Sequence, residues 1–88
     1  MWFIRLVKNN NPVTKERSMW FEQHMKEAEK WGVKVHQTYF TLGRYDIVSI
    51  LEAPDEKTAM RYGLALWPEA TSETLVAVSR EEVNKWMK

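Results

Sequence analysis

The sequence has no cysteine among its 88 residues, which excludes disulfides, thiol catalysis and cysteine-ligated zinc. It has only three glycines and three prolines, so no flexible linker or low-complexity segment is indicated. It also lacks an excess of charge of one sign, with a net charge of +1, and therefore offers no basic field for a nucleic acid. We expect one domain over residues 1–88, stabilised by packing, by self-association or by both.

Long hydrophobic runs are missing too. The opening Met1–Lys8 is too short, and charged too early at Arg5, to be a signal peptide or a membrane span. We therefore expect a cytoplasmic protein that does not contact a membrane. No carboxylate lies at ligand spacing from His24 or His36, the only two histidines, so no metal site is predicted. No phosphate-binding glycine loop, nucleophile elbow or carboxylate pair occurs, so no cofactor is predicted and any catalytic residue stays unknown.

The apolar periodicity predicts four strands and three helices. Strands are expected over residues 2–8, 33–40, 47–51 and 71–79. The first helix follows a cap at Thr14 or Asn11 and ends at Gly32, and the second runs from a cap at Asp55 to Pro68. A capping box at Ser79 begins a short terminal helix. The order predicts an α+β, ferredoxin-like βαββαβ domain with a short C-terminal helix and both other helices on one sheet face.

The two central runs are joined by the only glycine between them, Gly43. A glycine followed by Arg44 suits a two-residue type II′ turn, and this predicts a β-hairpin. The resulting register places Leu42 opposite Tyr45, Phe40 opposite Ile47 and Thr38 opposite Ser49.

Both faces of the predicted sheet are apolar, although one has no helices to cover it. Residues expected under the helices are the more aliphatic set: Ile4, Leu6, Val33, Val35, Val48, Ile50, Val76 and Val78. Residues expected on the other face are Arg5, His36, Thr38, Phe40, Ser49, Glu73 and Leu75. A bulge in any strand would exchange part of the two sets. A second copy of the chain is the expected cover for the helix-free face.

Four segments resemble the GYD-domain family, small proteins named for a Gly-x-Tyr-Asp motif. They are residues 39–46, which include Gly43-Arg44-Tyr45-Asp46, and residues 52–56, 64–66 and 72–75. The first segment, with Ala53-Pro54-Asp55, is more distantly similar to the ligand-sensing domain of the leucine-responsive, feast/famine regulators. Both resemblances imply a dimeric α+β barrel, in which two sheets pack face to face. The regulators also imply amino-acid binding near the hairpin at a contact between subunits.

These observations leave two classes of function open. The first is a module that binds a small carboxylate, including an amino acid, or mediates interaction between subunits. Its ligand-binding residues would be Arg44, Asp46, Tyr39 and His36, with the Arg44 guanidinium as the carboxylate partner. Asp46 has a purely structural alternative, as a cap for backbone amides of the turn. The second class is a small cofactor-independent enzyme of the monooxygenase or isomerase type, an idea that rests on analogy with other dimeric α+β barrels.

Overall fold

The computed structural model describes residues 1–87 and contains seven elements. In chain order these are β1 (Trp2–Asn9), α1 (Lys15–Glu29), β2 (Lys34–Phe40), β3 (Ile47–Glu52), α2 (Glu56–Leu64), β4 (Ala70–Ala77) and α3 (Arg80–Trp86). The strands form one antiparallel sheet in the order β2-β3-β1-β4. The predicted α+β, ferredoxin-like order with a short C-terminal helix is confirmed.

Each helix begins where a side chain accepts a hydrogen bond from a free backbone amide of the first turn. Thr14 Oγ1 accepts from Arg17 N (3.2 Å), and Ser79 Oγ accepts from Glu82 N (3.1 Å). Asp55 Oδ1 accepts from both the backbone nitrogen and the hydroxyl of Thr58 (2.8 Å each), and these bonds lower the pKa of Asp55. The predicted caps at Asp55 and Ser79 are confirmed, and of the two candidates for the first helix the cap is Thr14.

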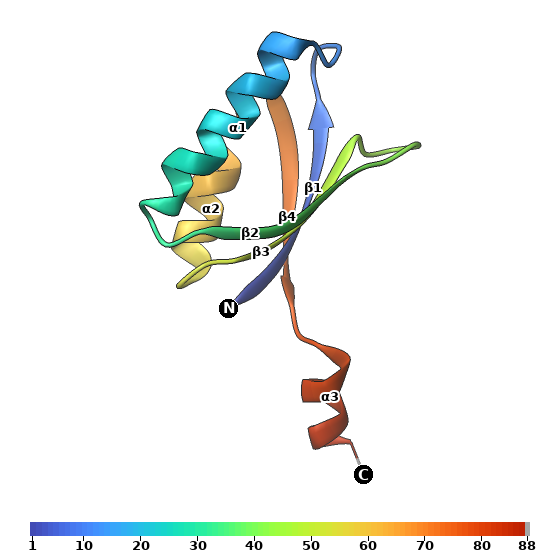
Figure 1. Cartoon of the computed structure of the whole chain (residues 1–88). Helices are drawn as coiled ribbons and strands as arrows, with labels where there is room; N and C mark the ends of the chain where they lie inside the picture. The colour runs from blue at the N-terminus through green and yellow to red at the C-terminus, as the bar shows by residue number, and fades with distance from the viewer. Residues whose placement is uncertain (88) are drawn as a thin grey trace.

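Helices α1 and α2 lie side by side on one face of the sheet (Figure 1). Between them and the sheet are two groups of buried residues. The first comprises Phe3, Ala28, Val33, Leu51, Ala53, Ala59 and Tyr62, and the second comprises Val7, Ile47, Leu66 and Ala70. The core therefore uses the odd-numbered residues of both central strands, β1 and β3, together with the inner sides of the helices.

The predicted face assignment is wrong for most of the sheet. Ile4, Leu6, Val48 and Ile50, expected under the helices, alternate with the buried residues and lie on the other face. Arg5 and Ser49, expected on the helix-free face, are buried under the helices. Thr38 and Phe40 point to the helices as well, because they pair with Ser49 and Ile47. Both faces are apolar, so hydrophobicity alone could not decide between them.

The other expected positions agree with the structure, except that of Val78, which was expected under the helices. Val33 is buried and Val35 packs against the first core group, both on the helix side. Val76 pairs with the core residue Phe3 and so also faces the helices. Glu73 and Leu75 pair with Leu6 and Ile4, which places them on the helix-free face as expected. Val78 follows the end of β4 and is exposed. We call the helix-free side the open sheet face, formed chiefly by Trp2, Ile4, Leu6, Tyr39, Val48, Ile50 and Leu75.

A bulge at His36 interrupts strand β2. Val35 pairs with Leu51 and Gln37 with Ile50, so His36 is the extra residue between two regular stretches. The ring of His36 lies over Trp2, with centroids 4.6 Å apart, and its Nε2 is 2.7 Å from Glu52 Oε1. Because Trp2 and Glu52 both belong to the open sheet face, His36 is on the face that was predicted for it.

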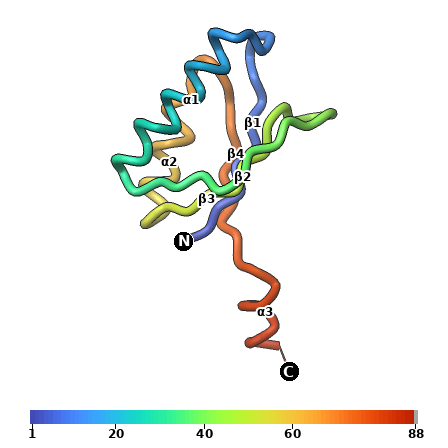
Figure 2. Tube along the Cα trace, viewed as in Figure 1, coloured from blue at the N-terminus to red at the C-terminus, as the bar shows by residue number. Residues whose placement is uncertain are grey.

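The connection between β2 and β3 is longer than predicted. Pairing stops at Phe40 and Ile47, and residues 41–46 form a loop that projects beyond the sheet (Figure 2). Its base is closed by hydrogen bonds from Thr41 N to Asp46 O (2.9 Å) and from Thr41 Oγ1 to Tyr45 O (2.7 Å). The predicted register of Phe40 and Thr38 is confirmed, but the two-residue turn is wrong. Gly43 does have the positive φ expected of it, +105°.

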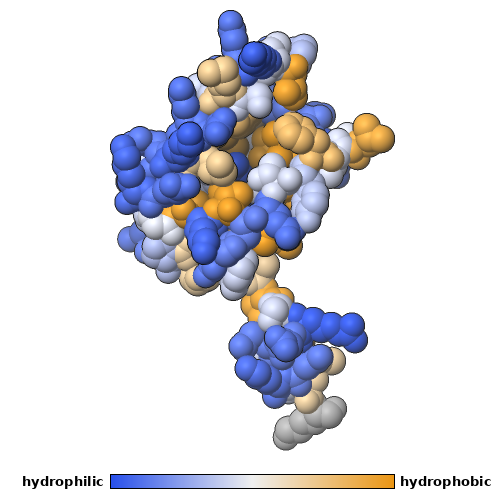
Figure 3. Space-filling view, in the orientation of Figure 1, coloured by the Kyte–Doolittle hydropathy of each residue, from blue (hydrophilic) through white to orange (hydrophobic). Residues whose placement is uncertain are grey.

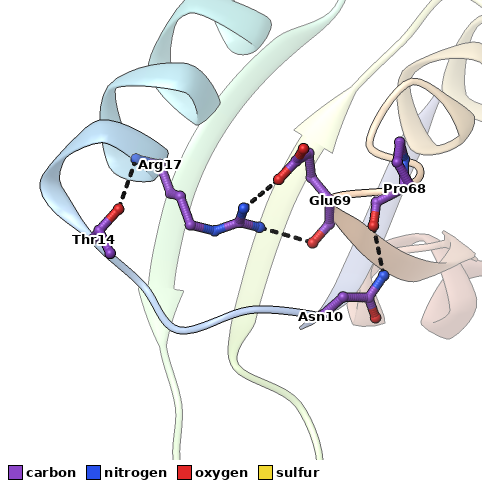
Figure 4. A network of polar contacts seen from close by, with 5 residues as sticks. All are labelled: Asn10, Thr14, Arg17, Pro68 and Glu69. Atoms are coloured by element: carbon purple, nitrogen blue, oxygen red, sulfur yellow. Dashed lines mark hydrogen bonds and ion pairs between the residues drawn. The ribbon is translucent and has the colours of Figure 1, made fainter.

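The N-terminal end of α1 is bonded to the segment that precedes β4 (Figure 4). The Arg17 guanidinium forms an ion pair with the Glu69 carboxylate and also donates to the Glu69 carbonyl oxygen (2.8 Å). Asn10 Nδ2 donates to the Pro68 carbonyl oxygen (2.7 Å). These bonds hold the start of α1 over the end of β1, and so they fix one end of the space beneath α1.

Candidate functional site

The space under α1 contains a partly open pocket of about 210 Å³. Its floor is formed by strands β1, β2 and β3, its roof by α1, and one wall by Tyr62 of α2. The lining residues are Arg5, Val13, Ser18, Phe21, Glu22, Met25, Thr38, Phe40, Ile47, Ser49 and Tyr62. We call this cavity the α1 pocket. It is a concave, largely apolar space with a few polar groups, which is the usual character of a small-molecule site.

Arg5 is the buried charge of this pocket. It sits at the middle of β1, and only 5% of its surface is exposed. One nitrogen, Nη2, donates to the Tyr62 hydroxyl oxygen (3.1 Å), while Nε and Nη1 are buried and have no hydrogen-bond partner within residues 1–87. Burial lowers the pKa of Arg5, although Tyr62 opposes this shift. An arginine stays charged nonetheless, so the pocket contains a cation with unused donors.

Tyr62 joins Arg5 to a stack of planar side chains. The Arg5 guanidinium carbon lies 3.9 Å from the centre of the Tyr62 ring, and His24 stacks on that ring with centroids 4.6 Å apart. Trp20 stacks on His24 in turn, with centroids 5.4 Å apart and nearly parallel planes. His24 Nε2 donates to the Tyr62 carbonyl oxygen (3.1 Å). The stack fixes the tyrosine ring, and with it the position of the guanidinium.

Burial and the Arg5 charge also shift the pKa values of Tyr62 and His24. Burial raises the pKa of Tyr62, against the opposing effect of Arg5, so the phenol keeps its proton at neutral pH. Burial lowers the pKa of His24, and the nearby Arg5 charge lowers it further, while the bond to the Tyr62 carbonyl opposes the shift. The stack therefore holds one permanent cation beside two neutral rings.

Two hydroxyls and an apolar mouth complete the pocket. Thr38 Oγ1 and Ser49 Oγ are 3.4 Å apart on neighbouring strands of the floor. Phe21 and Met25 come from α1, and Phe40 lies at the opening with 68% of its surface exposed. An occupant would meet one cation and two hydroxyls at the floor, Ser18 and the Glu22 carboxylate on α1, and mainly apolar groups elsewhere.

The structure gives Arg44 and Asp46 different surroundings. Asp46 Oδ2 accepts a hydrogen bond from Asn9 N (2.7 Å), and Asp46 N donates to Val7 O (2.8 Å). Its carboxylate thus joins the hairpin loop to the end of β1, rather than capping the turn. Arg44 is exposed, with its guanidinium carbon 5.7 Å from the centre of the Tyr45 ring, and lines a hollow of about 210 Å³ beside Lys8.

Tyr39 and His36, the other two predicted site residues, lie on the open sheet face and away from the loop tip. The Tyr39 hydroxyl donates to Gln37 Oε1, and His36 contacts Glu52 and Trp2. None of the four predicted residues lines the α1 pocket. Ligand binding at the hairpin stays a prediction.

Sequence reasoning missed Arg5 and Tyr62 as a pair. They are 57 residues apart, and nothing in their spacing brings them together. The available signal was a single charge inside the apolar run Phe3-Ile4-Arg5-Leu6-Val7, where an alternating strand places Arg5 on the same side as two core residues.

Within residues 1–87, no three side chains of the histidine, aspartate or glutamate type converge as metal ligands would. None of the helices described there has the length and hydrophobicity needed to cross a membrane.

The fold and the pocket define a small ferredoxin-like α+β protein with a buried arginine between its sheet and its first helix. The sequence model of the GYD domain matches residues 2–87, and the chain therefore belongs to the GYD domain family. A comparison with curated proteins found no match to this chain. The more distant similarity to the leucine-responsive regulators stays a prediction.

Proposed function

We propose that this protein binds a small molecule with a carboxylate and an apolar body in the α1 pocket. The observation that supports this proposal is Arg5, whose Nε and Nη1 are buried without a partner among the described residues. A buried unpaired charge is costly, and a fold retains one more readily when it has a counter-ion to bind. A carboxylate matches the planar donor fork of arginine and would offset that cost.

The other lining residues support the same ligand class. Thr38 and Ser49 can donate to a second oxygen of the ligand, while Phe21, Met25 and Phe40 offer contacts to its hydrocarbon part. The small volume favours short or compact acids. The hairpin proposal, with Arg44 as the carboxylate partner, uses the same chemistry at an exposed position, where water competes more strongly for the charge.

A thermal-shift series separates the two positions. We expect straight-chain and aryl monocarboxylates or amino acids to raise the Tm of the wild-type protein, and the corresponding primary amides to leave it unchanged. A ligand at one hundred times its Kd stabilises by about 2.7 kcal/mol. For a domain of this size that corresponds to a Tm rise of roughly 10 °C or more.

Two variants locate the ligand. Arg5→Met keeps an unbranched, though shorter, side chain and removes the charge, so we expect it to abolish the shift without lowering the Tm of the free protein. Arg44→Ala is the matched loss of an exposed arginine and should retain the full shift. The opposite pattern would place the ligand at the hairpin. No shift with any acid would reject carboxylate binding at either position.

An enzymatic use of the α1 pocket is a second candidate. It is favoured by Tyr62 and Glu22, a protonated phenol and a carboxylate that line the same space as Arg5. Together they could take a proton from a carbon next to the bound carboxylate and return one from the phenol, as in an isomerisation. Incubation of a binding acid in D₂O, followed by NMR, should then show deuterium at that carbon, and Tyr62→Phe should slow its incorporation. If no deuterium is incorporated, the enzymatic function is rejected and the binding function remains.

We also propose that two copies associate through the open sheet face. Its centre consists of Ile4, Leu6, Val48 and Ile50, on the two middle strands. Its charged groups lie toward the ends of those strands or on the edge strands, and they include Lys8, Lys34, Glu52 and Glu73. An apolar centre with a polar rim is typical of a protein interface, and a symmetric pair would cover the same face in each copy. Sedimentation of the wild-type protein as a monomer at micromolar concentration would contradict this proposal.

A further inference from the structure

Helix α3 exposes an apolar stripe that its own chain leaves uncovered. The helix follows β4 after only Val78 and Ser79, and it stands clear of the sheet and of the other helices (Figure 1). At 100° per residue, Val83, Trp86 and the following Met87 fall on one side of the helix, with Glu82 beside them and Lys85 opposite. Trp86 has 66% of its surface exposed. In the space-filling view α3 forms a separate lobe (Figure 3).

A groove on α2 is exposed in the same way. It is an open space of about 570 Å³ lined by Trp31, Lys57, Met60, Arg61, Leu64 and Ala65, and we call it the α2 groove. Met60 and Leu64 are 62% and 68% exposed. They are four residues apart and so form one ridge along the helix. Arg61 lies over the Trp31 ring, with its guanidinium carbon 3.8 Å from the ring centre, so the two side chains form one wall of the groove.

The side of α3 that carries the apolar stripe has one charge opposite to those of the groove. The groove carries Lys57 and Arg61, whereas Glu82 in the first turn of α3 borders the stripe. Arg80 borders the other side of the stripe, and Glu81 points away from it. Glu82 lies next to the apolar stripe and makes only a solvent-exposed contact with Lys85 (3.3 Å). A seven-residue helix is about 10 Å long, which is enough to cover the ridge of Met60 and Leu64.

We propose that α3 of one copy docks in the α2 groove of a second copy. Its apolar stripe packs against Met60 and Leu64, and Glu82 beside the stripe meets Lys57 and Arg61. A second copy is the fitting occupant because every copy supplies both an uncovered helix and an uncovered groove, so a reciprocal exchange covers all four surfaces at once. This inference does not depend on what the α1 pocket binds.

The absence of cysteine permits a direct test by disulfide trapping. The double variant Met60→Cys, Met87→Cys places one thiol in the groove and one on the apolar side of α3. On mild oxidation of the otherwise intact chain we expect disulfide-linked dimers. The matched control, Met60→Cys with Lys85→Cys, places its second thiol on the opposite side of α3 and should form them at least about tenfold more slowly, because a disulfide needs close Cβ atoms.

Further substitutions test the contacts themselves. Adding Trp86→Ala should slow trapping by about tenfold or more, as expected for a buried aromatic anchor. Lys57→Glu should slow it as well, and Glu82→Lys in the same chain should restore it. A disulfide within one chain would show that α3 folds back on its own groove and would overturn the proposal. Equal trapping rates for the test and control pairs would overturn it too.

Discussion

At the scale of residues, Gly32 and Gly43 share a backbone conformation but not an environment. Their φ angles are +90° and +105°, in the region where a side chain is strained. A Cβ on Gly32 would lie 2.8 Å from Pro54 Cγ, whereas a Cβ on Gly43 would have no heavy atom within 4 Å among the described residues. Backbone strain is therefore the only cost at Gly43, and a clash is added to it at Gly32.

Alanine substitution at these two positions should separate the two costs. We expect Gly43→Ala to lower the free energy of unfolding by roughly 1–2 kcal/mol, the cost of a left-handed residue. Gly32→Ala should lower it by roughly 2–4 kcal/mol, because overpacking against Pro54 is added. Urea titrations of the two variants and the wild type measure the difference. Equal losses would mean that the Pro54 ring moves aside without cost.

At the scale of elements, helix α1 places His24 in a stack of rings where the pKa of its imidazole is lowered. The imidazole stacks on both Trp20 and Tyr62, and the Arg5 cation lies over the tyrosine ring as well. Burial and that cation lower the pKa of His24 below its usual 6.5. The unfolded chain therefore binds a proton at a higher pH than the folded one does.

This difference predicts acid destabilisation through α1. Between the lowered folded pKa and 6.5 the unfolded state holds the extra proton, so the stability from His24 is complete above pH 6.5 and is lost as the pH falls below it. We expect the midpoint of urea unfolding to fall from pH 7.5 to 5.5. In His24→Gln, which cannot titrate, the fall should be smaller. Identical slopes in both proteins would assign the acid sensitivity to other groups.

Most of the elements were predictable because their signals are local. Thr14, Asp55 and Ser79 cap helices whichever way the sheet faces, and Gly32 has positive φ for a reason of local backbone geometry. The bulge at His36 has no local sequence signal. The six-residue hairpin loop was not predictable because Asp46 bonds to Asn9, 37 residues away in the sequence, and this bond draws the loop away from a tight turn. The Arg5–Tyr62 contact likewise exists only after the sheet and α2 have packed.

At the scale of the whole molecule, the reversed faces change which substitution tests self-association. Phe40 was expected in the interface, but it lies at the mouth of the α1 pocket. Val48 lies on the open sheet face, where it pairs with Leu6 and Tyr39. A charge at Val48 would be buried without a partner if two copies pack there, and it would be hydrated if they do not.

We therefore expect Val48→Asp to sediment as a monomer at concentrations where the wild type is a dimer. The Tm of the wild type should rise with protein concentration, because only the folded form associates, and the Tm of Val48→Asp should not. Phe40→Asp is the matched control on the helix side and should remain dimeric. Dissociation by Phe40→Asp but not by Val48→Asp would show that copies meet elsewhere.

The two edge strands of the sheet, β2 and β4, differ in regularity. Within residues 1–87, β2 and β4 each have one side without a neighbouring strand. The bulge at His36 interrupts the regular row of donors and acceptors along β2, whereas β4 pairs with β1 over its whole length, Ala70–Ala77, without such a break. An added β-strand needs an uninterrupted row of this kind. The molecule is thus protected from edge-to-edge growth on one side only, and any extension of the sheet into a fibre would begin along β4.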